Sequence, residues 1–128
     1  MSRNQRILVV AAAAVAVVVA YLIAKPGGGS KSSSSTPSVT RIRLSKDHVV
    51  GGPKKIKLKR NVRATIVASA DAKNTLHLHG YDIEKTALPG KPARFVFRAN
   101  QTGVFEFESH TFEDSGRPAQ VAKVLVEP

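Results

Sequence analysis

Two histidines separated by a single residue, His77 and His79, are the side chains of this sequence best suited to metal chemistry. They lie in residues 75–82, which read Thr-Leu-His-Leu-His-Gly-Tyr-Asp. Alternate side chains of a β-strand share a face, so the two imidazoles would project side by side, about 7 Å apart at the backbone, with Leu76 and Leu78 opposite. Each neutral imidazole offers one nitrogen lone pair to a transition metal. The pair is an incomplete site, and further ligands must come from elsewhere in the chain.

The other two histidines are His48 and His110. His48 lies in a loop, and we expect it to be a solvated surface residue. His110 follows a segment that alternates apolar and acidic residues, and it can join His77 and His79 if the strand ends or bends at that point. Three imidazoles would suit Cu(II) or Zn(II). A water molecule or a carboxylate would complete the shell, the candidates being Glu108, Glu113, Asp114 and Asp82. The alternative is that the histidines are surface or packing residues without a metal.

The sequence contains no cysteine, and its only methionine is Met1. This excludes disulfides, thiolate metal sites, cysteine nucleophiles and a lipid-modified cysteine anchor. No catalytic triad, phosphate-binding glycine loop or paired-acid arrangement is visible. Ser109 and His110 would make a poor dyad, because adjacent residues of a strand point to opposite faces. We therefore expect that the protein is not an enzyme.

The N-terminal part of the chain has the pattern of a membrane anchor. A basic segment, residues 1–6, precedes eighteen apolar residues at 7–24, which is about the minimum for a spanning helix. The basic residues favour a cytoplasmic N-terminus, which predicts a single-pass cell-membrane protein with an extracytoplasmic C-terminal domain. The alternative is a cleaved signal peptide that leaves a secreted or periplasmic domain. Residues 25–38 are rich in Gly, Ser and Pro and predict a flexible linker.

Residues 39–128 change to a period of two, which is typical of strands. Turn signals such as Gly51-Gly52-Pro53 recur every 8–12 residues, and no long helical period is present. We expect a strand ending at Gly80, a strand or loop at 82–86, a polar loop at 110–118, and further strands at 39–44, 54–60, 63–69, 93–99, 104–109 and 120–126. This pattern predicts an all-β fold, a Greek-key sandwich of two antiparallel sheets.

Residues 39–128 resemble the cupredoxins, the small copper-protein sandwiches. The resemblance rests on residues 77–82 and on the C-terminal hairpin of residues 103–110 and 121–126. In blue-copper members an upstream histidine meets a cysteine at the end of the penultimate strand, and a second histidine and often a methionine follow. Ser109 stands where that cysteine would be, so the sequence is more similar to the cysteine-less cupredoxin-like domains of bacterial envelope proteins.

This resemblance implies copper or iron handling without a blue-copper centre, because that centre needs a thiolate. It points to metal capture or delivery, with copper as the expected cofactor and zinc or no metal as alternatives. The candidate ligands remain His77, His79 and His110.

The formal net charge is +11. Four basic residues precede residue 39, so residues 39–128 carry 16 basic and 9 acidic side chains, a net charge of +7. Lys55, Lys57 and Lys59 would form a solvated stripe that protects a sheet edge. With few aromatics and an export signal, we expect no nucleic-acid partner. The alternative function is a metal-free interaction module that docks to an envelope protein or an anionic membrane surface. Nothing in the sequence indicates an oligomeric state.

Overall fold

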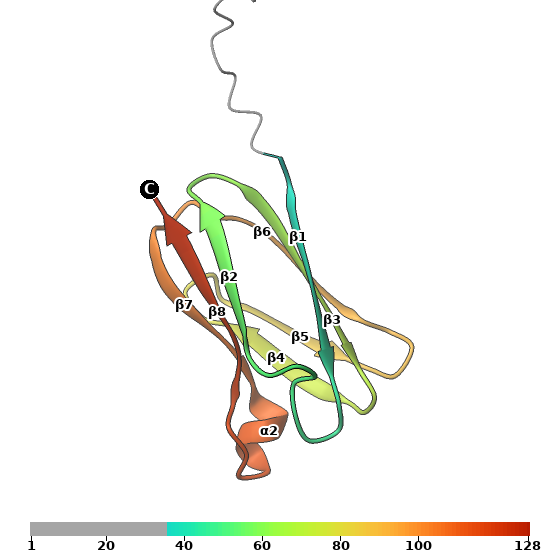
Figure 1. The fold of residues 1–128 in the computed structure, drawn as a ribbon. Coiled ribbons are helices and arrows are strands. Elements are labelled where there is room, and N and C mark those ends of the chain that lie inside the picture. Colours follow the sequence, from blue (N-terminus) through green and yellow to red (C-terminus); the bar gives the residue numbers. More distant parts are fainter. Residues whose placement is uncertain (1–35) are drawn as a thin grey trace, which may run out of the picture. The chain divides into compact units, whose positions relative to one another are not determined.

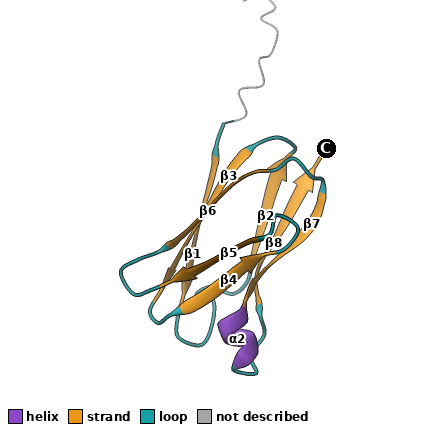
Figure 2. Cartoon of the chain, turned by 180° about the vertical axis from the view of Figure 1, so that it is seen from behind, coloured by secondary structure: helices purple, strands orange, loops and turns teal. Residues whose placement is uncertain are grey.

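The computed structural model describes residues 36–128. The predicted basic segment at 1–6, the apolar span at 7–24 and almost all of the linker at 25–38 lie outside this range. Within residues 36–128, no helix has the length and apolar character needed to cross a bilayer. Figures 1 and 2 show a two-layered β-structure with one short helix at one end.

The described part of the chain contains eight strands and one helix. The boundaries of the strands agree closely with those predicted from the sequence. In chain order they are β1 (Ser38–Leu44), β2 (Lys54–Lys59), β3 (Arg63–Ala70), β4 (Asn74–Leu78), β5 (Ile83–Ala87), β6 (Ala93–Arg98), β7 (Gly103–Ser109), α2 (His110–Asp114) and β8 (Gln120–Glu127). The segment at 82–86, for which the sequence left strand and loop open, is the strand β5.

The strands form a three-stranded sheet, in the order β1-β3-β6, and a five-stranded sheet, in the order β2-β8-β7-β4-β5. Strands adjacent in sequence are repeatedly placed in different sheets, and the predicted all-β Greek-key sandwich is confirmed. The expectation of purely antiparallel sheets is wrong, because β1 pairs with β3 in parallel and β2 pairs with β8 in parallel. The chain crosses to the other sheet after β1 and returns after β2. Each crossing reverses its direction, so β3 runs the same way as β1.

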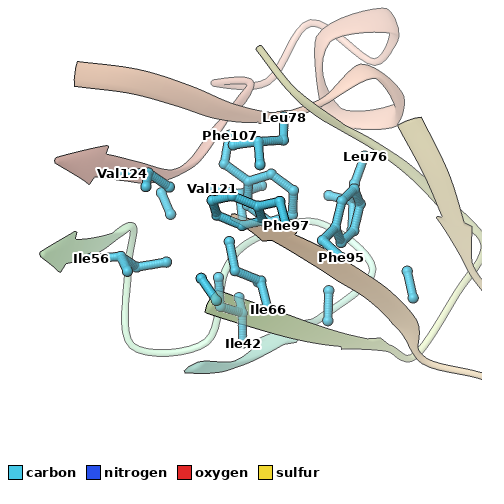
Figure 3. Close-up of a cluster of buried hydrophobic side chains, with 14 of the residues drawn as sticks. Ile42, Ile56, Ile66, Leu76, Leu78, Phe95, Phe97, Phe107, Val121 and Val124 are labelled. Atoms are coloured by element: carbon cyan, nitrogen blue, oxygen red, sulfur yellow. The ribbon is translucent and has the colours of Figure 1, made fainter. Parts of the chain in front are cut away.

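The core lies between the two sheets, where inward side chains of both meet (Figure 3). Phe95 of β6 and Phe107 of β7 pack edge to face, with ring centroids 4.9 Å apart. Leu76 and Leu78 of β4 are fully buried in this core. Burial of each leucine contributes about 1.5–3 kcal/mol, and a slip of β4 by one residue would expose both. The two leucines therefore fix the outward direction of His77 and His79.

The predicted polar loop at 110–118 begins instead with the helix α2. Ser109 acts as its N-cap, because its Oγ accepts a hydrogen bond of 3.0 Å from the backbone N–H of Phe112. Phe112 is buried against the core. A helix of five residues is too short to produce a visible period in the sequence, so the pattern could not reveal it.

Gly80 occupies a position that only glycine fits. Its φ is +84°, and a Cβ at this residue would lie 2.3 Å from Cδ1 of Phe105. We expect Gly80→Ala to lower the free energy of unfolding by about 2–3 kcal/mol, through backbone strain and overlap with the ring. Chemical denaturation measures this loss. Gly90→Ala is the matched control, because Gly90 has a φ of +76° and open space around it. Equal losses in the two variants would show that the contact with Phe105 contributes nothing.

Candidate metal centre

The three predicted ligands, His77, His79 and His110, lie together in the structure. One ring nitrogen from each lies within 4.8 Å of the others. The ring centroids of His77 and His79 are 4.2 Å apart, and those of His77 and His110 are 5.4 Å apart. All three side chains are half-buried. The convergence predicted from the sequence is therefore observed, on an accessible part of the surface.

The pairing of β4 with β7 explains this convergence. The strands are antiparallel and overlap over three residue pairs, in which Leu76 faces Ser109 and His77 faces Glu108. Because β7 ends at Ser109, His110 begins α2 beside His77. Because β4 and β7 are antiparallel, their C-terminal ends do not meet at one end of the sandwich. The histidines lie on the outer face of the five-stranded sheet.

Two carboxylates flank the histidine cluster. Glu84 of β5 and Glu108 of β7 are the two register partners of His77. Oε2 of Glu108 lies 2.9 Å from Nε2 of His79, and Oε2 of Glu84 lies 3.4 Å from Nδ1 of His110. Such contacts orient an imidazole and raise its basicity as a ligand. Within residues 36–128, Glu108 is the one of the four predicted carboxylates that contacts a histidine of the cluster.

Glu84 was missed by reasoning from the sequence. It reaches the cluster because β4 and β5 form a hairpin in which Leu78 pairs with Ile83, so that His77 pairs with Glu84. The connecting residues include two with positive φ, Gly80 and Asp82. The sequence did contain a signal for this pairing. Residues 79–82, His-Gly-Tyr-Asp, form a four-residue hairpin connection, so the residues on either side of it pair first and the next pair is His77 with Glu84.

Ser109 lies on the opposite side of the sheet from the histidines. It is fully buried, and its Oγ donates a hydrogen bond of 2.7 Å to Oδ1 of Asn74, which is also buried. The position where the resemblance places a copper thiolate is thus occupied by a polar pair inside the sandwich. Ser109 and His110 point to different sides, as expected for a poor catalytic dyad.

His48 is exposed in the connection between β1 and β2, as predicted. Its Nδ1 lies 2.7 Å from Oδ1 of Asp47, and Ser45 donates a further hydrogen bond of 2.9 Å to the same oxygen. These two hydrogen bonds, that of His48 first, lower the pKa of Asp47. His48 is therefore a surface residue outside the histidine cluster.

The cluster has the donor set of a divalent transition-metal site. Imidazole nitrogens bind zinc at about 2.0–2.1 Å, which places the ligands of a tetrahedral ion about 3.3 Å from one another. The three nitrogens lie within 4.8 Å of one another, a separation that side-chain rotation of the rings can adjust to this spacing. Borderline nitrogen ligands without thiolate or thioether suit Cu(II) and Zn(II) and lack the soft donors that select Cu(I).

No protein-family model matches the chain, and no curated protein matches it. Solved structures do resemble it. One chain in the cryo-EM structure of a heme-copper terminal oxidase dimer shares 15% identity at a TM-score of 0.55, with 98% of this chain and 100% of that chain covered. A multicopper oxidase shares 17% identity at 0.57, covering 70% and 44%, and one from Pediococcus acidilactici shares 11% at 0.58, covering 72% and 26%.

These similarities establish the class of fold. Residues 36–128 form a cupredoxin-like domain, as the resemblance of the sequence predicted. The chain spans less than half the length of the multicopper oxidases that it matches.

Proposed function

We propose that this protein binds copper, as Cu(II), through His77, His79 and His110. The observation that carries this proposal is the convergence of one nitrogen from each histidine to within 4.8 Å, with His77 on β4, His79 directly after it and His110 at the start of α2. Cu(II) binds to nitrogen sites more tightly than the other common divalent metals, and Zn(II) would use the same ligands.

We further propose a role in metal capture or delivery outside the cytoplasm, with the chain held to the membrane by its N-terminal apolar span. Two features support transfer of the metal over catalysis or electron transfer. The His79 side chain is 44% exposed and that of His110 is 35% exposed, so a second protein can reach the metal. Three protein ligands leave one position free for a ligand from that partner, and no thiolate is present to tune copper for electron transfer.

Titration of the purified full-length protein with Cu(II) tests the ligand set. We expect His77→Ala and His79→Ala each to weaken binding at least about tenfold, since each removes one of three ligands. His48→Ala is the matched control, because His48 is an exposed histidine in a different loop. The bound copper should show no intense visible charge-transfer band, because no thiolate is present. Equal affinity in wild type and both variants would refute the site.

A metal-free interaction module is the second candidate function. Lys55, Lys57 and Lys59 are exposed along β2, an edge strand of the five-stranded sheet, which supports docking to an acidic envelope partner. One chain of the heme-copper oxidase dimer structure matches this chain over nearly the full length of both. That chain is part of an assembly, which also supports an interaction role here. Reversal of the three lysine charges should abolish co-purification with the partner, and unchanged co-purification would count against this function.

A further inference from the structure

The outer face of the three-stranded sheet carries five exposed arginines and no lysine. They alternate with buried residues along β1, β3 and β6, the layer drawn in Figure 1 opposite β2 and β8. We call this surface the arginine face, consisting of Arg41, Arg43, Arg63, Arg94 and Arg98. Guanidinium groups bind phosphate and carboxylate through two parallel hydrogen bonds, which an ammonium group does not do. The face is therefore suited to oxyanions.

The charge of this face is poorly neutralised by the protein itself. Within residues 36–128, Arg43 alone of the five has a carboxylate within 4.0 Å, that of Asp71 at 3.9 Å, and both side chains are mostly exposed. Arg63 and Arg98 are direct cross-strand partners, an arrangement that is destabilising without a bridging anion. A shallow cavity of about 250 Å³ lies between them. Four of the five guanidinium groups therefore have no carboxylate partner within residues 36–128, and an anionic ligand would reduce the repulsion between them.

Most of the acidic residues lie outside the three strands that carry the arginine face. Five of the nine in the chain belong to β5, β7 and α2, namely Glu84, Glu106, Glu108, Glu113 and Asp114. The five-stranded sheet carries both signs of charge, because Lys55, Lys57 and Lys59 of β2 are exposed on it as well. The outward positions of β1, β3 and β6 carry arginines and no acidic residue, so an anionic surface meets no like charge on the arginine face, and the histidine cluster on the other sheet is left accessible.

Apolar side chains are interleaved with the arginines. Val39 and Val96 are 58% and 43% exposed, and both are register partners of Thr65. In the next row Val67 lies between Arg41 and Arg94. No aromatic residue occupies an outward position of these strands, so the face lacks the stacking platforms of nucleic-acid binders. Valines between guanidinium groups suit a lipid headgroup layer, where charged phosphates lie above apolar chains.

The position of β1 in the chain also favours a membrane. β1 begins at Ser38, and residues 25–37 separate it from the apolar span at 7–24. The flexible linker expected from this composition would have an end-to-end distance of about 20 Å. This step rests on the anchor named under the proposed function, which would keep the domain within reach of a bilayer surface whichever face docks.

We propose that the arginine face docks on a membrane surface of anionic phospholipids, with guanidinium groups on the phosphates and Val39 and Val96 between the headgroups. The histidine cluster then faces away from the bilayer.

The chain has no cysteine, so one introduced thiol can carry a fluorescent label without interference. We would reconstitute the full-length protein, labelled at Val96→Cys or, as control, at Lys57→Cys, into phosphatidylcholine vesicles with or without about 30 mole per cent phosphatidylserine and a lipid-borne quencher. Quenching at Val96→Cys should be at least about threefold greater with phosphatidylserine and should fall at high salt. Quenching at Lys57→Cys should not depend on phosphatidylserine.

Two triple variants separate this face from general basicity. Arg41→Gln, Arg63→Gln and Arg94→Gln together should abolish the effect of phosphatidylserine. Lys55→Gln, Lys57→Gln and Lys59→Gln together remove the same charge and should retain it, with both triples labelled at Val96→Cys. The proposal is overturned if phosphatidylserine has no effect, if the arginine triple retains its effect, or if the label responds to an oligonucleotide and not to vesicles. Flotation with neutral vesicles tests the anchor separately, and copper titration tests the histidine cluster.

Discussion

Ser109→Ala should lower the free energy of unfolding of the domain by about 2–4 kcal/mol. Ser109 Oγ makes two hydrogen bonds in a fully buried position, donating to Oδ1 of Asn74 and accepting from the backbone N–H of Phe112. Loss of an N-cap costs about 1 kcal/mol, and a buried acceptor left without its donor costs a further 1–3 kcal/mol. Urea denaturation of the wild type and of Ser109→Ala measures the difference.

Ser69→Ala is the control for this prediction, because Ser69 is an exposed serine on β3. It should change the free energy of unfolding by less than about 0.5 kcal/mol. A double-mutant cycle with Asn74→Ala should give a coupling energy of about 1 kcal/mol or more, as expected for residues in direct contact. A loss at Ser109 no greater than that at Ser69 would mean that neither hydrogen bond stabilises the fold.

The local features of the site follow from strand alternation alone. Leu76 and Leu78 must enter the core, so His77 and His79 must face outward, and no knowledge of other strands is needed. The same reasoning places Lys55, Lys57 and Lys59 on the solvent side of β2, where the structure has them. The face that a strand residue occupies depends only on its immediate neighbours in the sequence. For this reason the sequence predicts well which side chains point into the core and which point outward.

The register between distant strands could not be predicted in this way. Glu84 belongs to the site because His77 pairs with it, and His110 belongs to it because β7 overlaps β4 by three residues. A shift of either pairing by two residues would leave the same side chains facing the core. It would nevertheless move Glu84 or His110 about 7 Å away from the cluster. The direction of β3 relative to β1 likewise depends on two crossings between the sheets. These crossings do not change the hydrophobic pattern of either strand, so the sequence does not reveal them.

Copper binding should raise the melting temperature of the domain by about 10–20 °C when free Cu(II) is one hundred times its dissociation constant. At that concentration a ligand specific to the folded state adds about 2.7 kcal/mol of stability. Each kcal/mol corresponds to about 4–8 °C for a domain of this size. The proposed ligands join β4 to the start of α2, so the metal would hold together two elements that are distant in sequence. Differential scanning calorimetry with and without Cu(II) measures the shift, and a chelator should reverse it.

The variants assign this stabilisation to particular histidines. His48→Ala should retain the full shift, whereas His77→Ala should lose most of it, because His77 is the ring nearest to both other members of the cluster. His110→Ala is the decisive variant, since it removes the one ligand that comes from α2. A shift in His110→Ala equal to that of the wild type would restrict the site to His77 and His79, and the metal would then stabilise no contact between β4 and α2.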